Sequence, residues 1–276
     1  MTGHSEFARM EQAGWADAAT VAAYARDFGK AAEQCVSTLV GATRAGPGQD
    51  ALDLCCGHGI LANGLVAAGA RVTGLDFSPA FLEIARQGVP AANFVEGDAM
   101  ALPFDDESFD AITIGCGIPH VPDPPRVLSE CARVLRPGGR LAYSVWHGAD
   151  QFGAFSAVFS AIARHGDPSV TMPSGPGAHD YGEPKRAFET LAQVGFDEMA
   201  LETVESYWTC DDLGAVYDYF LEGTVRGGVM LRRQPPAAQA AIRAAVVAEL
   251  RANLGETGPW RVPVPAAIVS ATRIKP

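Results

Sequence analysis

The sequence predicts an α/β fold built on a doubly wound, mainly parallel sheet, and three observations lead to that prediction. Short apolar segments alternate with helical patterns between about residues 50 and 146. Acidic or glycine-rich residues follow most of these segments directly. In sheets of this kind, ligands bind outside the carboxyl ends of the strands, so these residues should meet at one edge.

The elements of the sheet can be assigned in order. Residues 11–44 have apolar side chains at helical spacing, and the Pro/Gly-containing segment 44–49 interrupts the pattern. The predicted strands are 50–56, 71–78, 93–99, 109–118 and 140–146. The predicted helices between them are 60–69, 79–88 and 125–135, the last closed by residues 136–139. Ser78 should cap the second of these helices, with Pro79 at its first position.

The second half of the chain is less regular. Residues 151–166 form an apolar helical pattern, and a Pro/Gly/Ser-rich loop follows at 167–184. A helix is expected up to residue 196, then a strand over 198–208. A helical block, about 211–255, precedes a last strand over 264–274.

Composition limits the partners and the compartment. The 276 residues, 48% of them hydrophobic, suffice for one enlarged domain or a domain with a lid. Acidic residues outnumber basic ones by 32 to 21, and this net charge of −11 disfavours nucleic acid. No apolar run approaches the roughly 20 residues of a membrane span, and no signal peptide is recognised at the N-terminus. We expect a cytoplasmic protein with a small-molecule substrate; a homodimer is the one protein partner considered.

The stretch Leu52–Leu61, LDLCCGHGIL, allows four interpretations. A zinc site is disfavoured because adjacent cysteines on a strand point to opposite faces and no second ligand pair lies nearby, so no metal is expected. A redox pair needs exposed, low-pKa thiols, whereas all six cysteines fall in predicted core elements and are expected to be free and buried. The last two interpretations are a dinucleotide loop and a loop for a cationic nucleoside.

The dinucleotide interpretation rests on a short motif. Gly57, Gly59 and Ala62 fit G-x-G-x-x-[G/A], and Asp76 lies where a ribose-binding acid belongs. Asp53 opposes it, because a carboxylate at the mouth of a pyrophosphate loop repels phosphate. A ligand with an ammonium group and two ribose hydroxyls, such as S-adenosylmethionine (SAM), fits both carboxylates.

Four ordered motifs resemble those of a known family. LDLCCGHG, GLDFS, VEGDAMALPFDDESFDAITIGCGIPHVPD and RVLRPGGRL together resemble class I SAM-dependent methyltransferases, closest to the ubiquinone/menaquinone-biosynthesis group. The resemblance covers about residues 50–146. It implies a Rossmann-like seven-stranded sheet of order 3-2-1-4-5-7-6 with strand 7 antiparallel, SAM as methyl donor and S-adenosylhomocysteine (SAH) as product.

The resemblance also implies roles for individual residues around SAM. Asp53 and the backbone of Cys56, Gly57 and Gly59 would hold the methionine part. Asp76 would bind the ribose hydroxyls, with Phe77 against the adenine. Asp98 and the N–H of Ala99 would contact the adenine, and Cys116 and Gly117 would lie beneath the sulfonium. Tyr24, in a helix that would fold over SAM, and Met100 are the remaining cofactor contacts expected.

Two features of the chain depart from that family pattern. His58 stands where Thr or Ser is usual; hydrogen bonding to the SAM carboxylate and no role at all are equally acceptable interpretations. Pro119-His120 stands where the biosynthesis group usually has Arg-Asn, which argues against simple transfer of its quinone-precursor substrate.

Candidate catalytic residues follow the fourth and fifth strands. A protein base is needed only if the acceptor must lose a proton, and His120 is the first candidate, His147 the second. For each, the alternative is a loop histidine bonded to backbone. Candidate acceptor-binding residues are aromatic; for Phe152 and Phe155 core packing is the competing explanation. The full set is Phe152, Phe155, Tyr181, Tyr217 and Phe220.

We therefore expect three segments: an N-terminal helical cap (1–46), a SAM-binding core (47–210 and 260–276) and a helical lid insertion (211–259). The leading hypothesis is transfer of a methyl group to a small, apolar or aromatic metabolite at O, N or C. The alternatives are a SAM-binding enzyme that catalyses a pericyclic or elimination step, and a non-catalytic SAM-binding protein.

Overall fold

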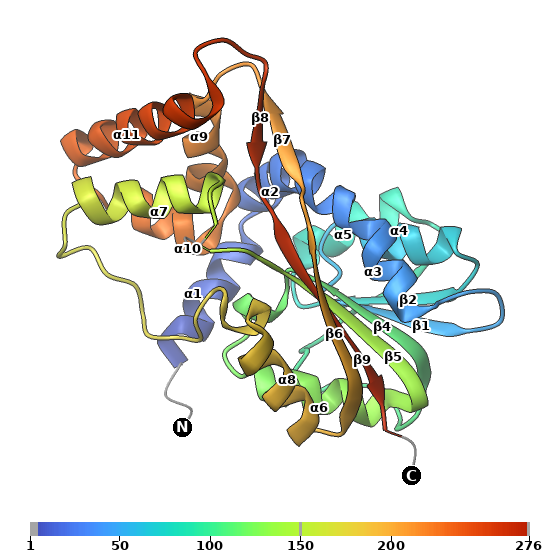
Figure 1. Cartoon of the computed structure of the whole chain (residues 1–276). Coiled ribbons are helices and arrows are strands. Elements are labelled where there is room, and N and C mark those ends of the chain that lie inside the picture. The colour runs from blue at the N-terminus through green and yellow to red at the C-terminus, as the bar shows by residue number, and fades with distance from the viewer. Residues whose placement is uncertain (1–4, 149–150, 275–276) are drawn as a thin grey trace. The chain divides into compact units, whose positions relative to one another are not determined.

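A seven-stranded sheet forms the centre of the larger of two compact units (Figure 1). The computed structural model describes residues 5–148 and 151–274. The strand order is β3-β2-β1-β4-β5-β9-β6, with β9 antiparallel to both of its neighbours. The predicted fold class is confirmed, since β6 and β9 take the places of the sixth and seventh strands. The strands of this sheet are β1 (Asp50–Leu54), β2 (Arg71–Asp76), β3 (Asn93–Glu96), β4 (Phe109–Gly115), β5 (Leu135–Trp146), β6 (Phe196–Val204) and β9 (Ala266–Arg273).

The sheet unit consists of Ala32–Trp146, Pro176–Val204 and Ala266–Pro276. Two of its helices precede the first strand, and the others lie between strands in sequence, as the alternating pattern predicts. They are η1 (Glu33–Cys35), α3 (Val36–Thr43), α4 (Ile60–Ala67), α5 (Pro79–Gly88), η2 (Ile118–His120), α6 (Pro124–Val134), η3 (Asp180–Gly182) and α8 (Pro184–Gln193). Ser78 caps α5 as predicted: its side chain accepts from the N–H of Phe81, with Pro79 at the first helical position.

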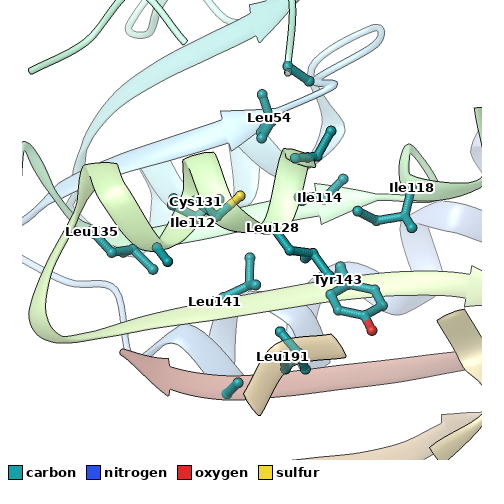
Figure 2. Close-up of a cluster of buried hydrophobic side chains, with 14 of the residues drawn as sticks. Leu54, Ile112, Ile114, Ile118, Leu128, Cys131, Leu135, Leu141, Tyr143 and Leu191 are labelled. Carbon is teal, nitrogen blue, oxygen red and sulfur yellow. The ribbon is translucent and has the colours of Figure 1, made fainter. Parts of the chain in front are cut away.

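The two faces of the sheet carry separate cores because side chains alternate along a strand. Leu52 and Leu54 of β1 belong to a cluster with α6 and α8, which Figure 2 shows around Leu128, Tyr143 and Leu191. Ala51, directly before Leu52, belongs to a cluster with α4 and α5 on the other face. Asp53 shares the face of Ala51, two residues away, and therefore points toward α4.

The second unit, Met1–Ala31, His147–Gly175 and Glu205–Pro265, is mainly helical. Its elements are α1 (Ser5–Ala16), α2 (Ala18–Ala32), α7 (Ala154–His165), β7 (Tyr207–Cys210), α9 (Gly214–Gly223), α10 (Val225–Arg232), α11 (Pro236–Leu254) and β8 (Trp260–Pro263). Contacts thus group the chain differently from the three predicted segments, whose boundaries stay a prediction. No helix within 5–148 and 151–274 is long and apolar enough to cross a membrane.

Several predicted boundaries were wrong, among them the ends of the second, third and fourth strands, which lie at Asp76, Glu96 and Gly115. The first strand ends at Leu54, because Cys55 has a φ of 55° and turns the chain. The fifth strand begins at Leu135 and not at residue 140: α6 ends at Val134, close to the predicted position, but residues 136–139 already belong to β5 and form a bulge where the pairing with β4 jumps from Leu135 to Arg140. The predicted strand 198–208 is divided at Glu205 and Ser206, and β7 then pairs with β8 in a sheet of its own.

Candidate functional site

Two buried carboxylates lie at the ends of adjacent parallel strands. Asp53 of β1 is fully buried, and Asp76 ends β2 with 6% of its surface exposed. Burial raises the pKa of Asp53 to about 8 and also raises the pKa of Asp76. Carboxylates removed from water in this way favour a cationic or hydrogen-bond-donating ligand, because either one would stabilise the ionised form.

Asp53 is held by two donors from different elements. Its Oδ2 accepts from the N–H of Ala62 in the first turn of α4 at 2.8 Å, and its Oδ1 accepts from Thr113 Oγ1 at 3.1 Å. Thr113 stands directly beside Asp53 in the β1–β4 register, so its side chain emerges on the same face. Thr113 was not among the residues predicted from the sequence. The sequence feature that could have indicated Thr113 is that it is a polar residue within an otherwise apolar strand segment, AITIG.

Asp76 connects the glycine loop to the end of β2. Its Oδ2 accepts from the N–H of Gly57 at 2.9 Å, and its Oδ1 accepts from the N–H of Ser78 at 2.9 Å. Each carboxylate oxygen has two lone-pair positions, so both oxygens keep capacity for one further donor. Two vicinal ribose hydroxyls would supply those two donors.

The glycine loop itself offers few amide groups to a ligand. The N–H of Cys56 donates to Leu75 O, that of Gly57 to Asp76, and that of Gly59 to Cys56 O. Gly57 and Gly59 both have positive φ, 51° and 88°, which explains their residue type. A pyrophosphate loop needs free N–H groups. Because these three are engaged, the dinucleotide interpretation is disfavoured and a cationic ligand is favoured. Any contact of the Cys56, Gly57 and Gly59 backbone with the methionine part of SAM would therefore be made by carbonyl groups, which suit its ammonium group.

The two cysteines of the loop serve packing. Cys56 is buried and Cys55 half-buried, and burial raises the pKa of both thiols. All six cysteines are free, and the other four are buried. Among the described residues, no group of three or more His, Cys, Asp or Glu side chains could hold a metal ion.

The segment after β3 carries the predicted adenine contacts. Asp98 is exposed, and its Oδ1 accepts from the N–H of Met100 at 2.8 Å, which closes a turn. Ala99 is buried and Met100 half-buried. Phe77, directly after Asp76, is 36% exposed, as expected for an aromatic ring that would lie against a base.

The turn after β4 is held by β5. Cys116 has a φ of 53°, and its N–H donates to Ser144 Oγ at 3.0 Å. Its Sγ lies 3.3 Å from the same oxygen. Gly117 follows, and a Cβ there would lie 2.5 Å from Cys55 Cβ, so only glycine fits. Ser144, buried in β5, is a second positioning residue that the sequence did not reveal.

His120 ends η2, the short helix that follows Gly117. It is half-buried, and its charge lowers the pKa of Asp76, so it lies within electrostatic reach of the ribose-binding candidate. His58 is half-buried in the glycine loop beside Phe81, and burial lowers its pKa to about 4. His58 is therefore neutral at physiological pH.

The other predicted site residues divide between the two units. Tyr181 packs in the core of the sheet unit with 2% exposure, and its carbonyl accepts from Tyr143 Oη at 3.1 Å. Tyr24, Phe155 and Phe220 belong to an aromatic cluster of the helical unit. In that cluster Phe28 stacks on Tyr24 at 5.5 Å, and Phe155 meets Phe220 edge-on at 4.9 Å.

Three further candidates lie in the helical unit. Phe152 precedes α7 and is 38% exposed. Tyr217 is buried, and its Oη has no hydrogen-bond partner among the described residues. His147 follows β5, and its Nδ1 lies 3.3 Å from Gln151 Nε2.

Comparison with known proteins places this geometry in a family. Residues 52–143 match the family described as "Methyltransferase domain". The demethylmenaquinone methyltransferase of Renibacterium salmoninarum is 33% identical over 195 residues, which cover 67% of this chain and 80% of that protein. The chain belongs to the class I SAM-dependent methyltransferases.

Other class I methyltransferases agree with this assignment to different extents. The demethylmenaquinone methyltransferase of Clavibacter sepedonicus is 46% identical over 97 residues, 34% of this chain and 40% of that one. A putative methyltransferase from Bacillus halodurans has the same fold, with a TM-score of 0.58, 18% identity and coverage of 87% of this chain and 99% of the other. The chain is thus a SAM-dependent methyltransferase for a small molecule.

Proposed function

We propose that this methyltransferase transfers the methyl group of SAM to a small, apolar or aromatic metabolite at O, N or C. The observation that carries the proposal is the loop whose three amides are engaged, lying between two buried carboxylates. This chemistry suits a ligand that is cationic at its amino acid end and carries two ribose hydroxyls. Bound SAM supplies a methyl group already activated on a sulfonium.

The residues present fit such a cofactor. Asp53 would receive the ammonium group, and ionisation of its carboxyl would be restored by that charge. Asp76 would accept from both ribose hydroxyls through its remaining lone pairs. Phe77 would cover the adenine, and the Asp98 carboxylate would accept a hydrogen bond from the adenine amino group. Cys116 and Gly117 would line the floor beneath the sulfur.

Methyl transfer depends mainly on holding the acceptor in line with the transferred group and on excluding water. For an acceptor that must lose a proton, His120 would be the base, since it follows the Gly117 turn and lies near Asp76. His147 is the second candidate. The base would be dispensable for an acceptor that is already nucleophilic.

The helical unit supports an aromatic acceptor. Its cluster of stacked rings includes the half-buried Tyr24 and Phe155, and Tyr217 presents a buried hydroxyl whose hydrogen bond an acceptor oxygen would complete. Phe152 and Phe220 complete the proposed set in the helical unit, and Tyr181 is left out of it because it packs in the core of the sheet unit. Arg226 does not favour a phosphorylated acceptor, because it pairs with the buried Glu11 at 3.0 Å.

The proposed acceptor differs from demethylmenaquinone, which the names of the relatives indicate for those proteins. Pro119 and His120 replace the Arg-Asn pair usual in that group, so a different nucleophile should be accommodated. A homodimer and a cytoplasmic location stay predictions.

A radiolabelled methyl assay tests the proposal. The enzyme is incubated with labelled SAM and a panel of phenols, quinols and amines, with Asp76→Ala as the inactive control. Labelled product that depends on Asp76 supports transfer. Consumption of an acceptor without label would indicate the non-transfer alternative, and binding of SAM without either outcome would indicate a non-catalytic role.

A further inference from the structure

The segment between β3 and β4 has few internal bonds to fix its position. It carries Asp98 and Ala99, the proposed contacts of the adenine base. Beyond the Asp98 turn, with Ala101 N donating to Asp98 O at 3.0 Å, it relies on groups from elsewhere in the chain. At its start the N–H of Gly97 donates to Asp76 O of β2 at 3.1 Å. The side chains that bind the rest of the segment come from α6, which the mechanism does not otherwise use.

Glu130 of α6 binds the segment through a backbone amide. Its Oε2 accepts from the N–H of Leu102 at 2.8 Å, and Glu130 itself is only 5% exposed. Arg133 holds the carboxylate in place with two bonds, Nε to Oε1 at 3.0 Å and Nη2 to Oε2 at 2.8 Å. This pairing also lowers the pKa of Glu130, so the carboxylate stays ionised.

Two arginines reach the carbonyl groups of the same segment. Arg133 donates to Leu102 O at 3.0 Å and to Phe104 O at 2.8 Å. Arg126, two turns earlier on α6, donates to Met100 O at 3.0 Å. The N–H and C=O of Leu102 therefore both form hydrogen bonds, and so does the carbonyl of Met100, the residue after Ala99.

The arrangement is more specific than a helix packing on a loop. Bonds from charged groups are stronger than neutral ones, and a bidentate arginine–carboxylate pair has a defined geometry. The bonds fall at Met100, Leu102 and Phe104, which alternate along the chain. The Arg126 bond at Met100 holds the backbone within two residues of Asp98 and Ala99, and the bonds at Leu102 and Phe104 hold the chain that follows.

We propose that Glu130, Arg133 and Arg126 are positioning residues that set the selectivity of the enzyme for adenine. They hold the backbone of residues 98–102 so that Asp98 accepts from the amino group of the base and the Ala99 N–H donates to its ring. This inference rests on the proposed SAM site. A base with a carbonyl in place of the amino group would meet the Asp98 carboxylate and be repelled.

The test compares SAH with S-inosylhomocysteine, in which a carbonyl replaces that amino group and the neighbouring ring nitrogen carries a hydrogen. Calorimetry measures the dissociation constants of both for the wild type, Glu130→Gln, Arg133→Met and Arg126→Met. The wild type should prefer SAH, and in the variants that preference should fall about tenfold, mostly through weaker SAH binding. Thermal unfolding verifies that each variant is folded.

Arg136→Met is the matched control. Arg136 also pairs with carboxylates, Asp110 at 2.7 Å and Asp50 at 3.3 Å, but at the opposite ends of β1 and β4. It should keep the wild-type preference. Arg126 is the decisive position if the buried pair proves necessary for folding, because its side chain is 54% exposed.

The outcomes separate the two proposals. An unchanged preference in folded Arg126→Met and Glu130→Gln, or equal losses for both nucleosides, would overturn the positioning role and leave the SAM site intact. A wild type that binds neither nucleoside would overturn the proposed function and the positioning role with it.

Discussion

The backbone N–H of Gly57 donates to Asp76 Oδ2 over 2.9 Å, and this bond joins the turn after β1 to the carboxylate that ends β2. One residue thereby fixes the glycine loop and faces the proposed ribose. The bond also consumes an amide that a phosphate-binding loop would need. The relationship explains why a glycine motif of the dinucleotide type can serve a cationic nucleoside.

Asp76→Ala should abolish SAM binding measured by calorimetry. The substitution removes the two proposed ribose bonds and leaves the Gly57 N–H without its acceptor. Asp110→Ala, on a carboxylate paired with Arg136, is the control and should bind normally. If Asp76→Ala retained micromolar affinity for SAM, Asp76 would not be the residue that binds the ribose.

The stability of the enzyme without cofactor should fall as pH rises from about 4 to about 8. Burial raises the pKa of Asp53 from 3.8 to about 8, so in this range the native carboxyl binds a proton that the unfolded one has lost. The loss from this group approaches about 1.4 kcal/mol per pH unit. Asp53→Asn should flatten the dependence, as measured by denaturant unfolding at each pH. The same slope in the variant would exclude Asp53 as its source.

His120→Ala should slow turnover about a hundredfold for an acceptor that must lose a proton. SAH affinity should stay near that of the wild type, because His120 is not among the proposed SAM contacts and Asp76 keeps its bonds from Gly57 and Ser78. Steady-state kinetics and calorimetry measure the two quantities separately. His147→Ala should have the smaller effect on turnover. Wild-type turnover by His120→Ala would eliminate it as the base.

Gly117→Ala should destabilise the fold, because its new Cβ would lie 2.5 Å from Cys55 Cβ and 3.0 Å from Ile114 Cγ2. We expect a loss of about 1–3 kcal/mol. In a Cys55→Gly background the loss should be smaller, and glycine suits the φ of 55° at that position. A double-mutant cycle by thermal unfolding measures the coupling. Strict additivity of the two changes would contradict the contact.

The carboxylates at the strand ends were predictable because strand, turn and helix patterns are local in the sequence. Asp53, Asp76 and Asp98 each follow directly from such a pattern. The residues that hold them were not predictable in the same way. Thr113 reaches Asp53 from 60 positions away, and Glu130 reaches Leu102 from 28. Such contacts can be predicted only once the strand order and the helix packing are known.

Local exceptions account for the wrong boundaries. Cys55 and Cys116 both adopt positive φ, which non-glycine residues rarely do, so no strand end was expected at Leu54. The glycines of residues 136–139 resemble a helix stop, yet they allow a bulge that keeps β5 paired with β4. Tyr181 is an aromatic residue in a long loop, as binding-site residues often are, but it packs in the core.

Calorimetric titration of the wild-type enzyme with SAH and, in parallel, with NADH tests the central claim most directly. Two buried carboxylates around a loop with engaged amides should bind SAH at micromolar concentration or below and should not bind NADH. Binding of NADH with no binding of SAH would contradict the account.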